Sequence, residues 1–134
     1  MQHLVNIALL VNDYDEAIAF YTKKLQFTLV EDTILSPTKR WVRVQPPGGT
    51  GCCILLAKAG NTEQKKQVGQ QSGGRVFLFI HTDNFNHDYQ NLLKHNVKII
   101  RPKTIEPHGT VAVFEDLYGN LFDLIEPRQI SIHQ

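Results

Sequence analysis

The sequence predicts an α+β fold in which two βαβββ modules form a cupped, largely antiparallel eight-stranded sheet. The main observation is that the order strand, helix, strand, strand, strand is written twice along the chain. A second observation is that two aspartates at expected helix starts, Asp13 and Asp83, lie 70 residues apart. The length of 134 residues suffices for one hydrophobic core. We therefore expect a single domain over residues 1–134, with a first module at 4–57, a connecting loop at 58–74 and a second module at 75–127.

The first module opens with an almost wholly apolar run from Leu4 to Val11, which favours a buried strand over a helix. Asp13 then provides a helix cap, with Glu16 three residues later as in a capping box. Apolar residues at helical spacing predict a helix over residues 14–24. Three strands are expected to follow, over residues 27–34, 39–45 and 51–58.

The connecting segment, residues 60–74, is polar and rich in Gly and Gln, which predicts a long loop with a short helix around residues 63–68. An apolar strand is expected at residues 75–82. Asp83 then caps a second helix, whose apolar residues stand at positions i, i+4, i+7 and i+8. The last three strands are expected at residues 97–100, 110–115 and 121–126, with a tight turn at 116–120 between the final two.

Composition argues against several function classes. The chain carries 14 basic and 13 acidic residues, and this balance argues against nucleic-acid binding, which needs a basic surface. No apolar run reaches the roughly 18 residues of a membrane span, and the N-terminus does not resemble a signal peptide. We therefore expect a cytoplasmic protein without a membrane partner.

The only cysteines, Cys52 and Cys53, are expected to pack on opposite faces of a strand rather than to form a disulfide or a zinc site.

Two motifs on the doubled pattern resemble signatures of the glyoxalase, bleomycin-resistance and extradiol-dioxygenase superfamily, also called the vicinal-oxygen-chelate superfamily. The first is Val11-x-Asp13-x-x-x-Ala17-x-x-Phe20-Tyr21 followed by Leu25-x-Phe27, and the second is Phe114-x-Asp116-x-x-Gly119-Asn120-x-x-Asp123-Leu124. The resemblance covers residues 4–126. It implies paired modules, a small-molecule ligand in the sheet cup, and a homodimer in which the cup is completed across a twofold axis.

Metal-dependent members of that superfamily bind a divalent cation with two His and two carboxylates, or close variants, one from each of four cup strands. By position these ligands fall on Asn6, on Leu55, on or near Phe77, and on Asp123. Only Asp123 keeps an ordinary ligand chemistry, because an amide oxygen is a weak ligand and the other two side chains cannot ligate. The resemblance therefore implies the cup without its metal. Whether Asp123 takes part in an atypical metal site stays open.

Strand alternation indicates which side chains face the cup. On the strand at 39–45, Val42 and Val44 share the face expected to pack on the helix, so Trp41 and Arg43 face the cup. Parity with the matched positions adds further residues from the second module. The expected ligand-binding residues are Asn6, Trp41, Arg43, Leu55, Phe77, His81, His108 and Asp123.

The sequence leaves two or more roles open for most of these residues. Arg43 is suited to bind a carboxylate or phosphate bidentately, or it is an exposed strand arginine. His81 is a candidate acid or base, or it bonds to the backbone at a strand end. His108 lies in a loop over the cup rim, or simply on the surface. Asp123 is a vestigial metal ligand, a general base or a carboxylate paired for structure, and Trp41 stacks on a flat ligand or fills the core.

Two functions follow from these observations. The first is a metal-free, bleomycin-resistance-like protein that binds a small aromatic or anionic organic ligand and needs no cofactor. Its motivation is the loss of metal-ligating positions together with an aromatic cup lining. The second is a glyoxalase-like lyase or isomerase, or a dioxygenase-type enzyme, that uses a divalent metal or residual acid and base groups. No catalytic residue is assigned.

Overall fold

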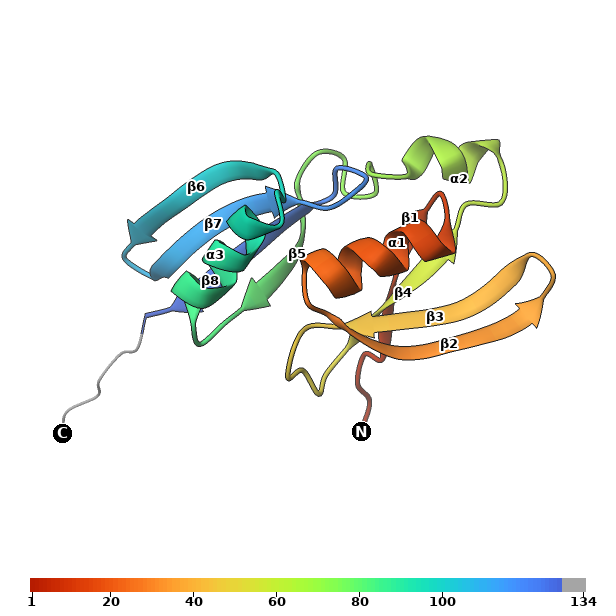
Figure 1. Cartoon of the computed structure of the whole chain (residues 1–134), viewed down its shortest axis with the longest axis horizontal. Helices are drawn as coiled ribbons and strands as arrows, with labels where there is room; N and C mark the ends of the chain where they lie inside the picture. The colour runs from red at the N-terminus through yellow and green to blue at the C-terminus, as the bar shows by residue number, and fades with distance from the viewer. Residues whose placement is uncertain (129–134) are drawn as a thin grey trace. The chain divides into compact units, whose positions relative to one another are not determined.

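The computed structural model describes residues 1–128, and the chain divides into two compact units at Gly73 and Gly74. Each unit contains one four-stranded sheet, and Figure 1 shows α1 lying along one face of the first sheet and α3 along one face of the second. The doubled module predicted from the sequence is therefore confirmed. The strands form two four-stranded sheets, each of them mixed rather than purely antiparallel.

The first unit has the strand order β1-β4-β3-β2. Strands β1 and β4 pair in parallel, and the other two pairings are antiparallel, because the first and last strands of the module run in the same direction. Its elements are β1 (Asn6–Val11), α1 (Tyr14–Ala19), a π-helical turn (Phe20–Lys24), β2 (Thr28–Ser36), β3 (Lys39–Gln45), β4 (Cys53–Lys58) and α2 (Thr62–Gln67).

The second unit repeats this arrangement with the strand order β5-β8-β7-β6, and β5 and β8 are its parallel pair. Its elements are β5 (Val76–His81), α3 (Phe85–Lys94), β6 (Ile99–Glu106), β7 (Gly109–Glu115) and β8 (Leu121–Pro127). Asp116 closes the β7–β8 turn, since its carboxylate accepts hydrogen bonds from the backbone of Tyr118 and Asn120 at 2.9 Å each. The predicted tight turn is therefore confirmed.

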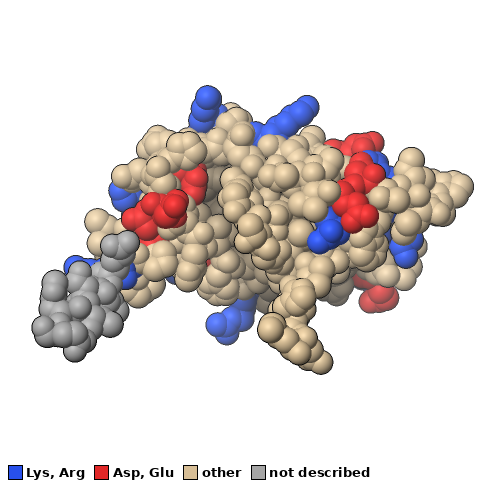
Figure 2. Space-filling model, turned by 90° about the horizontal axis from the view of Figure 1, so that it is seen from below, with Lys and Arg blue, Asp and Glu red and all other residues tan. Residues whose placement is uncertain are grey.

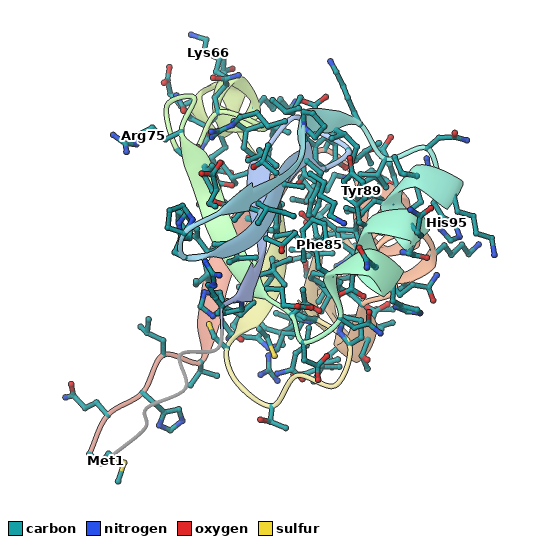
Figure 3. The ribbon with its side chains drawn as sticks, turned by 90° about the vertical axis from the view of Figure 1, so that its left-hand side faces the viewer. Met1, Lys66, Arg75, Phe85, Tyr89 and His95 are labelled. Atoms are coloured by element: carbon teal, nitrogen blue, oxygen red, sulfur yellow. The ribbon has the colours of Figure 1, made fainter. Side chains whose placement is uncertain are left out.

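Each unit buries one face of its sheet under its own helix. In the second unit Phe122 and Leu124 alternate along β8 with more exposed residues, and Phe122 stacks on Phe114 of β7 with ring centroids 5.3 Å apart. Phe85, at the start of α3, packs onto this layer and is almost fully buried (Figure 3). In the first unit the corresponding layer consists of Leu9, Val11, Ala17, Tyr21, Val42, Val44 and Leu56, all fully buried. The opposite face of each sheet therefore remains available for a site.

The first helix is shorter than the prediction of one α-helix over residues 14–24. The α-helix ends at Ala19, and a π-helical turn continues to Lys24. The wider turn allows the consecutive residues Phe20 and Tyr21 both to be buried, with their rings edge to face at 5.6 Å. Apolar spacing alone does not distinguish these two kinds of turn.

The prediction that Asp83 caps the second helix is wrong. Asn84 is the cap, and its side-chain oxygen accepts a hydrogen bond from the backbone N–H of His87 at 3.3 Å. The hydroxyl of Thr82 accepts a hydrogen bond from the backbone N–H of Asn84 at 3.0 Å, which helps fix the chain in this register. Both residues are good caps, so composition could not decide between them.

Strand β6 is longer than the predicted strand at 97–100, because it continues to Glu106 through Pro102. A proline is tolerated there because β6 is the edge strand of its sheet. The pairing with β7 shifts register on both sides of Arg101, which accommodates the missing N–H.

The connecting segment contains the predicted short helix, α2, and it also protects the edge of the first sheet. The side-chain oxygen of Gln71 accepts a hydrogen bond from the backbone N–H of Leu10 at 2.6 Å, and its amide nitrogen donates to the carbonyl of Ala8 at 3.1 Å. Gln71 thus offers β1 the hydrogen bonds that a neighbouring strand would offer.

The surface charge and the length of the helices can be compared with two expectations from the sequence, the lack of a basic nucleic-acid-binding surface and the lack of a membrane span. On the face shown in Figure 2, basic and acidic side chains are interspersed among many uncharged ones rather than gathered into one basic patch. None of the helices within residues 1–128 is long and apolar enough to cross a membrane.

Candidate functional site

A cavity of about 370 Å³ lies on the face of the second sheet opposite α3. Asp123 of β8 pairs in register with Val113 of β7, and both alternate along their strands with residues buried under the helix. The side chains of this face come from three adjacent strands and from the β6–β7 turn. The lining consists of Arg101, Pro102, Thr104, Glu106, His108, Val111, Ala112, Val113 and Asp123.

Asp123 is the most unusual group in this lining. One of its carboxyl oxygens, Oδ1, is buried and has no hydrogen-bond partner among the described residues. Burial raises the pKa of Asp123, and the positive charges of Arg101, His108 and His81 offset part of that rise. The fold thus keeps this carboxyl in a place where its ionised form is less favourable than in water.

Arg101 is the main cation of the site, and sequence reasoning missed it. It lies on the exposed edge strand β6, opposite Val113, and it makes no hydrogen bond or ion pair to another side chain within residues 1–128. The predicted strand ended at residue 100, so Arg101 fell outside every element. Extending that strand to the length of its counterpart in the first module would have found it.

In the first unit, Arg43 is held by partners on the three other strands. Its Nε donates to the Asn6 side-chain oxygen at 2.9 Å, and Nη1 lies 3.4 Å from Glu31 Oε1. Nη2 lies 3.3 Å from the sulfur of Cys53. The Arg43 side chain is only 21% exposed. Its donors are therefore largely occupied within the first sheet.

The remaining first-unit candidates lie around Arg43. Leu55 of β4 is its neighbour in register, and Trp41 lies two residues earlier on β3, opposite Thr33. Trp41 and Leu55 are both half-buried. The cysteines are free, with Cys53 buried and Cys52 half-buried.

The second-unit candidates divide into two groups. His81 and Phe79 share the face of Asp123, as predicted, since β5 pairs them with Ile125 and Asp123 of β8. Phe77 instead lies at a register shift between its two neighbours and is left out of the ladder. His108 lies in the β6–β7 turn and lines the cavity. The structure therefore brings Asp123 and His108 together, with His81 near enough to influence the charge of Asp123.

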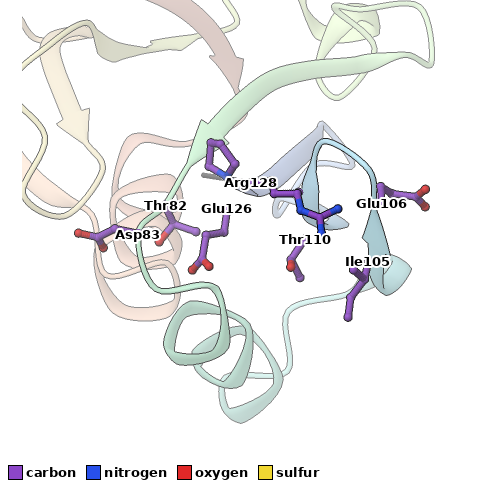
Figure 4. Close-up of a pocket in the computed structure, with 9 residues that line it drawn as sticks. Thr82, Asp83, Ile105, Glu106, Thr110, Glu126 and Arg128 are labelled. Carbon is purple, nitrogen blue, oxygen red and sulfur yellow. The ribbon is translucent and has the colours of Figure 1, made fainter. Parts of the chain in front are cut away.

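A larger hollow of about 630 Å³ lies at the N-terminal end of α3 (Figure 4). Glu126 in its wall accepts a hydrogen bond from the backbone N–H of Phe85 at 2.9 Å, and the Thr82 hydroxyl donates to Asp88 at 2.6 Å. These groups stabilise the start of the helix, so the hollow's polar lining is partly committed to the fold. None of the predicted site residues lines it.

Residues 3–124 match the sequence model of the Glyoxalase/Bleomycin resistance protein/Dioxygenase superfamily. The chain belongs to this superfamily. The family resemblance drawn from the two sequence motifs is thereby confirmed.

Similar proteins match nearly the whole length of the chain. An uncharacterised protein of Shewanella frigidimarina (strain NCIMB 400) is 55% identical over 126 residues, covering 93% of each chain. The crystal structure of UcmS2 is 29% identical, with a TM-score of 0.82, and the match covers 94% of this chain and 98% of that one. TnmS3, described as an antibiotic binding protein from Streptomyces sp. CB03234, is 24% identical, with a TM-score of 0.78, and the match covers 96% and 98%.

The residues expected from the sequence at the superfamily's metal-ligand positions do not offer the donor atoms of a divalent metal site. Asn6 has its amide oxygen occupied by Arg43, and the side chains of Leu55 and Phe77 carry no ligand atom. Only Asp123 offers a carboxylate. Within residues 1–128, no three His, Cys, Asp or Glu side chains are grouped so that they could hold a metal. We therefore assign no metal-dependent role to these residues.

Proposed function

We propose that the protein binds a small organic ligand, aromatic or anionic, in the cavity over β6, β7 and β8, without the metal of its superfamily. The observation that carries this proposal is the Asp123 carboxyl in the cavity wall, whose buried oxygen has no partner among residues 1–128. Leaving such a group unsatisfied costs about 1–3 kcal/mol, and unsatisfied buried groups call for a specific explanation. A binding role for Asp123 supplies one.

The composition of the lining supports a ligand rather than a purely structural hollow. Val111 and Val113 provide an apolar floor, and Arg101, Thr104 and His108 provide polar groups around it. An apolar surface with a few convergent polar groups is the usual make-up of a small-molecule site. TnmS3, which is described as an antibiotic binding protein, has the same fold, and this likeness supports the proposal without identifying the ligand.

We also propose that the protein acts as a cytoplasmic homodimer and as a single domain. Large apolar side chains on both sides of the cavity support contact with a second copy. Phe79 of β5 is 63% exposed and Ile105 of β6 is 80% exposed in the single chain. Both side chains are therefore available to pack against a second copy.

The experiment is thermal unfolding of the purified protein with a panel of small anionic, neutral and cationic aromatic compounds. Some compounds are expected to raise the melting temperature of the wild type. Thr104→Trp fills the cavity and is expected to remove this rise, whereas Thr33→Trp, an exposed position on β2 of the first sheet, leaves it intact. Rises that survive Thr104→Trp and disappear in Thr33→Trp would place the site elsewhere.

The metal-free part of the proposal is tested in the same melts after dialysis against EDTA. We expect an unchanged melting temperature and unchanged ligand-induced rises, because no ligand set for a metal is formed within residues 1–128. If EDTA removes a stoichiometric Ni, Zn, Mn or Fe together with the ligand response, the metal-dependent alternative is correct.

A further inference from the structure

The two sheets can be compared position by position, because they have the same strand order and pairing. In the first sheet, Arg43 of β3 lies opposite Glu31 of β2. In the second sheet, Val113 of β7 lies opposite Arg101 of β6. In the second sheet the arginine therefore lies on the edge strand instead of the inner strand. The residue opposite it is a valine instead of a glutamate.

The two arginines therefore differ in their hydrogen-bond and ion-pair partners. Arg43 has Glu31 at 3.4 Å and the Asn6 oxygen at 2.9 Å, so the chain itself supplies its counter-charge. Arg101 faces an apolar neighbour, is exposed, and has no ion pair within 4.0 Å in residues 1–128. A guanidinium has five N–H donors in a fixed fork, which match a carboxylate. Since no side chain within residues 1–128 occupies the donors of Arg101, they are available for a ligand.

Asp123 does not neutralise Arg101 as Glu31 neutralises Arg43. The two groups are near enough for the charge of Arg101 to act on Asp123, yet no contact within 4.0 Å joins them. The unpartnered Oδ1 of Asp123 lies in the wall of the same cavity. A group bound in the cavity therefore meets an arginine that no described carboxylate contacts.

The other titratable groups of the cavity lining do not offset the positive charge of Arg101. His108 and His81 can only add positive charge near Asp123. Glu106 is the second carboxylate of the lining, but it lies five residues beyond Arg101 on β6, opposite Gly109. That is roughly 15 Å along an extended strand, farther than the screening length of about 8 Å at physiological salt.

We propose that the cavity binds an aryl carboxylate, with the carboxylate on the guanidinium of Arg101 and the ring on Val111 and Val113. This inference rests on the proposed function and narrows it to one class of ligand.

Isothermal titration calorimetry with three isosteric probes tests the class of ligand: 2-naphthoate, 2-naphthamide and 2-naphthylmethylammonium. We expect 2-naphthoate to bind at least tenfold more tightly than either of the others. Arg101→Gln is expected to remove this preference. Lys103→Gln is the matched control, because it removes the same charge from the same strand, but Lys103 points to Asn86 of α3, with Nζ 3.0 Å from its oxygen.

Equal or tighter binding of the amide or the ammonium probe, blocked by Thr104→Trp, would overturn the aryl carboxylate and leave the proposed function standing. Binding of all three probes that Thr104→Trp does not weaken would overturn both. Absence of saturable 2-naphthoate binding to the wild type would overturn the inference.

Discussion

At the scale of single residues, Asp123 shows how a motif position acquires its chemistry from its surroundings. The sequence marked it as the one metal-ligand position that keeps a carboxylate. The structure adds that its Oδ1 is buried without a partner among residues 1–128 and that burial raises its pKa. Neither property can be seen in the sequence, because both depend on which strands flank β8.

Asp123→Asn is expected to raise the stability of the unliganded protein at neutral pH. The pKa of Asp123 is higher in the folded chain than in the unfolded chain, so its ionisation costs stability as pH rises through the folded pKa. The advantage of the variant should be present at pH 7 and vanish near roughly pH 3, where the carboxyl is mostly protonated in both states. Urea unfolding between about pH 3 and pH 8 measures this difference.

Asp83→Asn serves as the control, since it removes the same charge from an exposed position in the same unit. Lower stability of Asp123→Asn than of the wild type at pH 7 would mean that the carboxylate is stabilised in the fold, and the argument from burial would fail.

Arg101 and Asn84 mark the limit of residue-level prediction. Arg101 was missed because the predicted strand ended at residue 100, whereas the observed strand continues through Pro102, which its edge position tolerates. Asn84 was missed because Asp83 is an equally good cap by composition. For Arg101 the deciding feature, the pairing of β6 with β7 at the sheet edge, comes from outside the local sequence.

At the scale of elements, Arg43 acts as a tie across the first sheet. It lies on β3 and contacts Asn6 of β1, Glu31 of β2 and Cys53 of β4, so one side chain joins all four strands. Alternation along β3 correctly predicted its face, opposite the buried Val44. The sequence could not show that its donors are occupied, because its partners come from three other strands.

Arg43→Ala is expected to destabilise the protein by about 1–3 kcal/mol, because it leaves half-buried polar partners without their hydrogen bonds. Lys39→Ala on the same strand is the control and should stay within about 0.5 kcal/mol of the wild type, since Lys39 is exposed. Urea unfolding measures both. An effect of Arg43→Ala no larger than the control, together with weaker binding of an anion, would contradict this structural role and support the predicted role of Arg43 as a ligand anchor.

The elements themselves were largely predictable, and the failures have physical causes. Strand β3 was predicted with its observed bounds, Lys39–Gln45, because clean alternation of apolar and polar residues is a direct consequence of strand geometry. The π-helical turn at Phe20–Lys24 was not, because apolar spacing cannot separate it from an α-helix.

At the scale of the whole molecule, the doubled module is the feature that the sequence predicted best. The repeat is written in element order and needs no tertiary information. The chemistry of each half was not predictable in the same way. One sheet neutralises its arginine with Glu31, and the other leaves Arg101 opposite a valine. The two halves share an architecture but differ in what their open faces offer, and this difference places the proposed ligand on the second sheet.

The most direct test of this account is a titration of ¹⁵N-labelled protein with 2-naphthoate, followed residue by residue in ¹H–¹⁵N correlation spectra. The account predicts saturable shift changes at residues of the cavity lining, above all Arg101, His108, Val111, Val113 and Asp123. The residues around Arg43 and those at the start of α3 should be unaffected. Changes concentrated around Arg43, or around Thr82 and Glu126 at the other hollow, would contradict it.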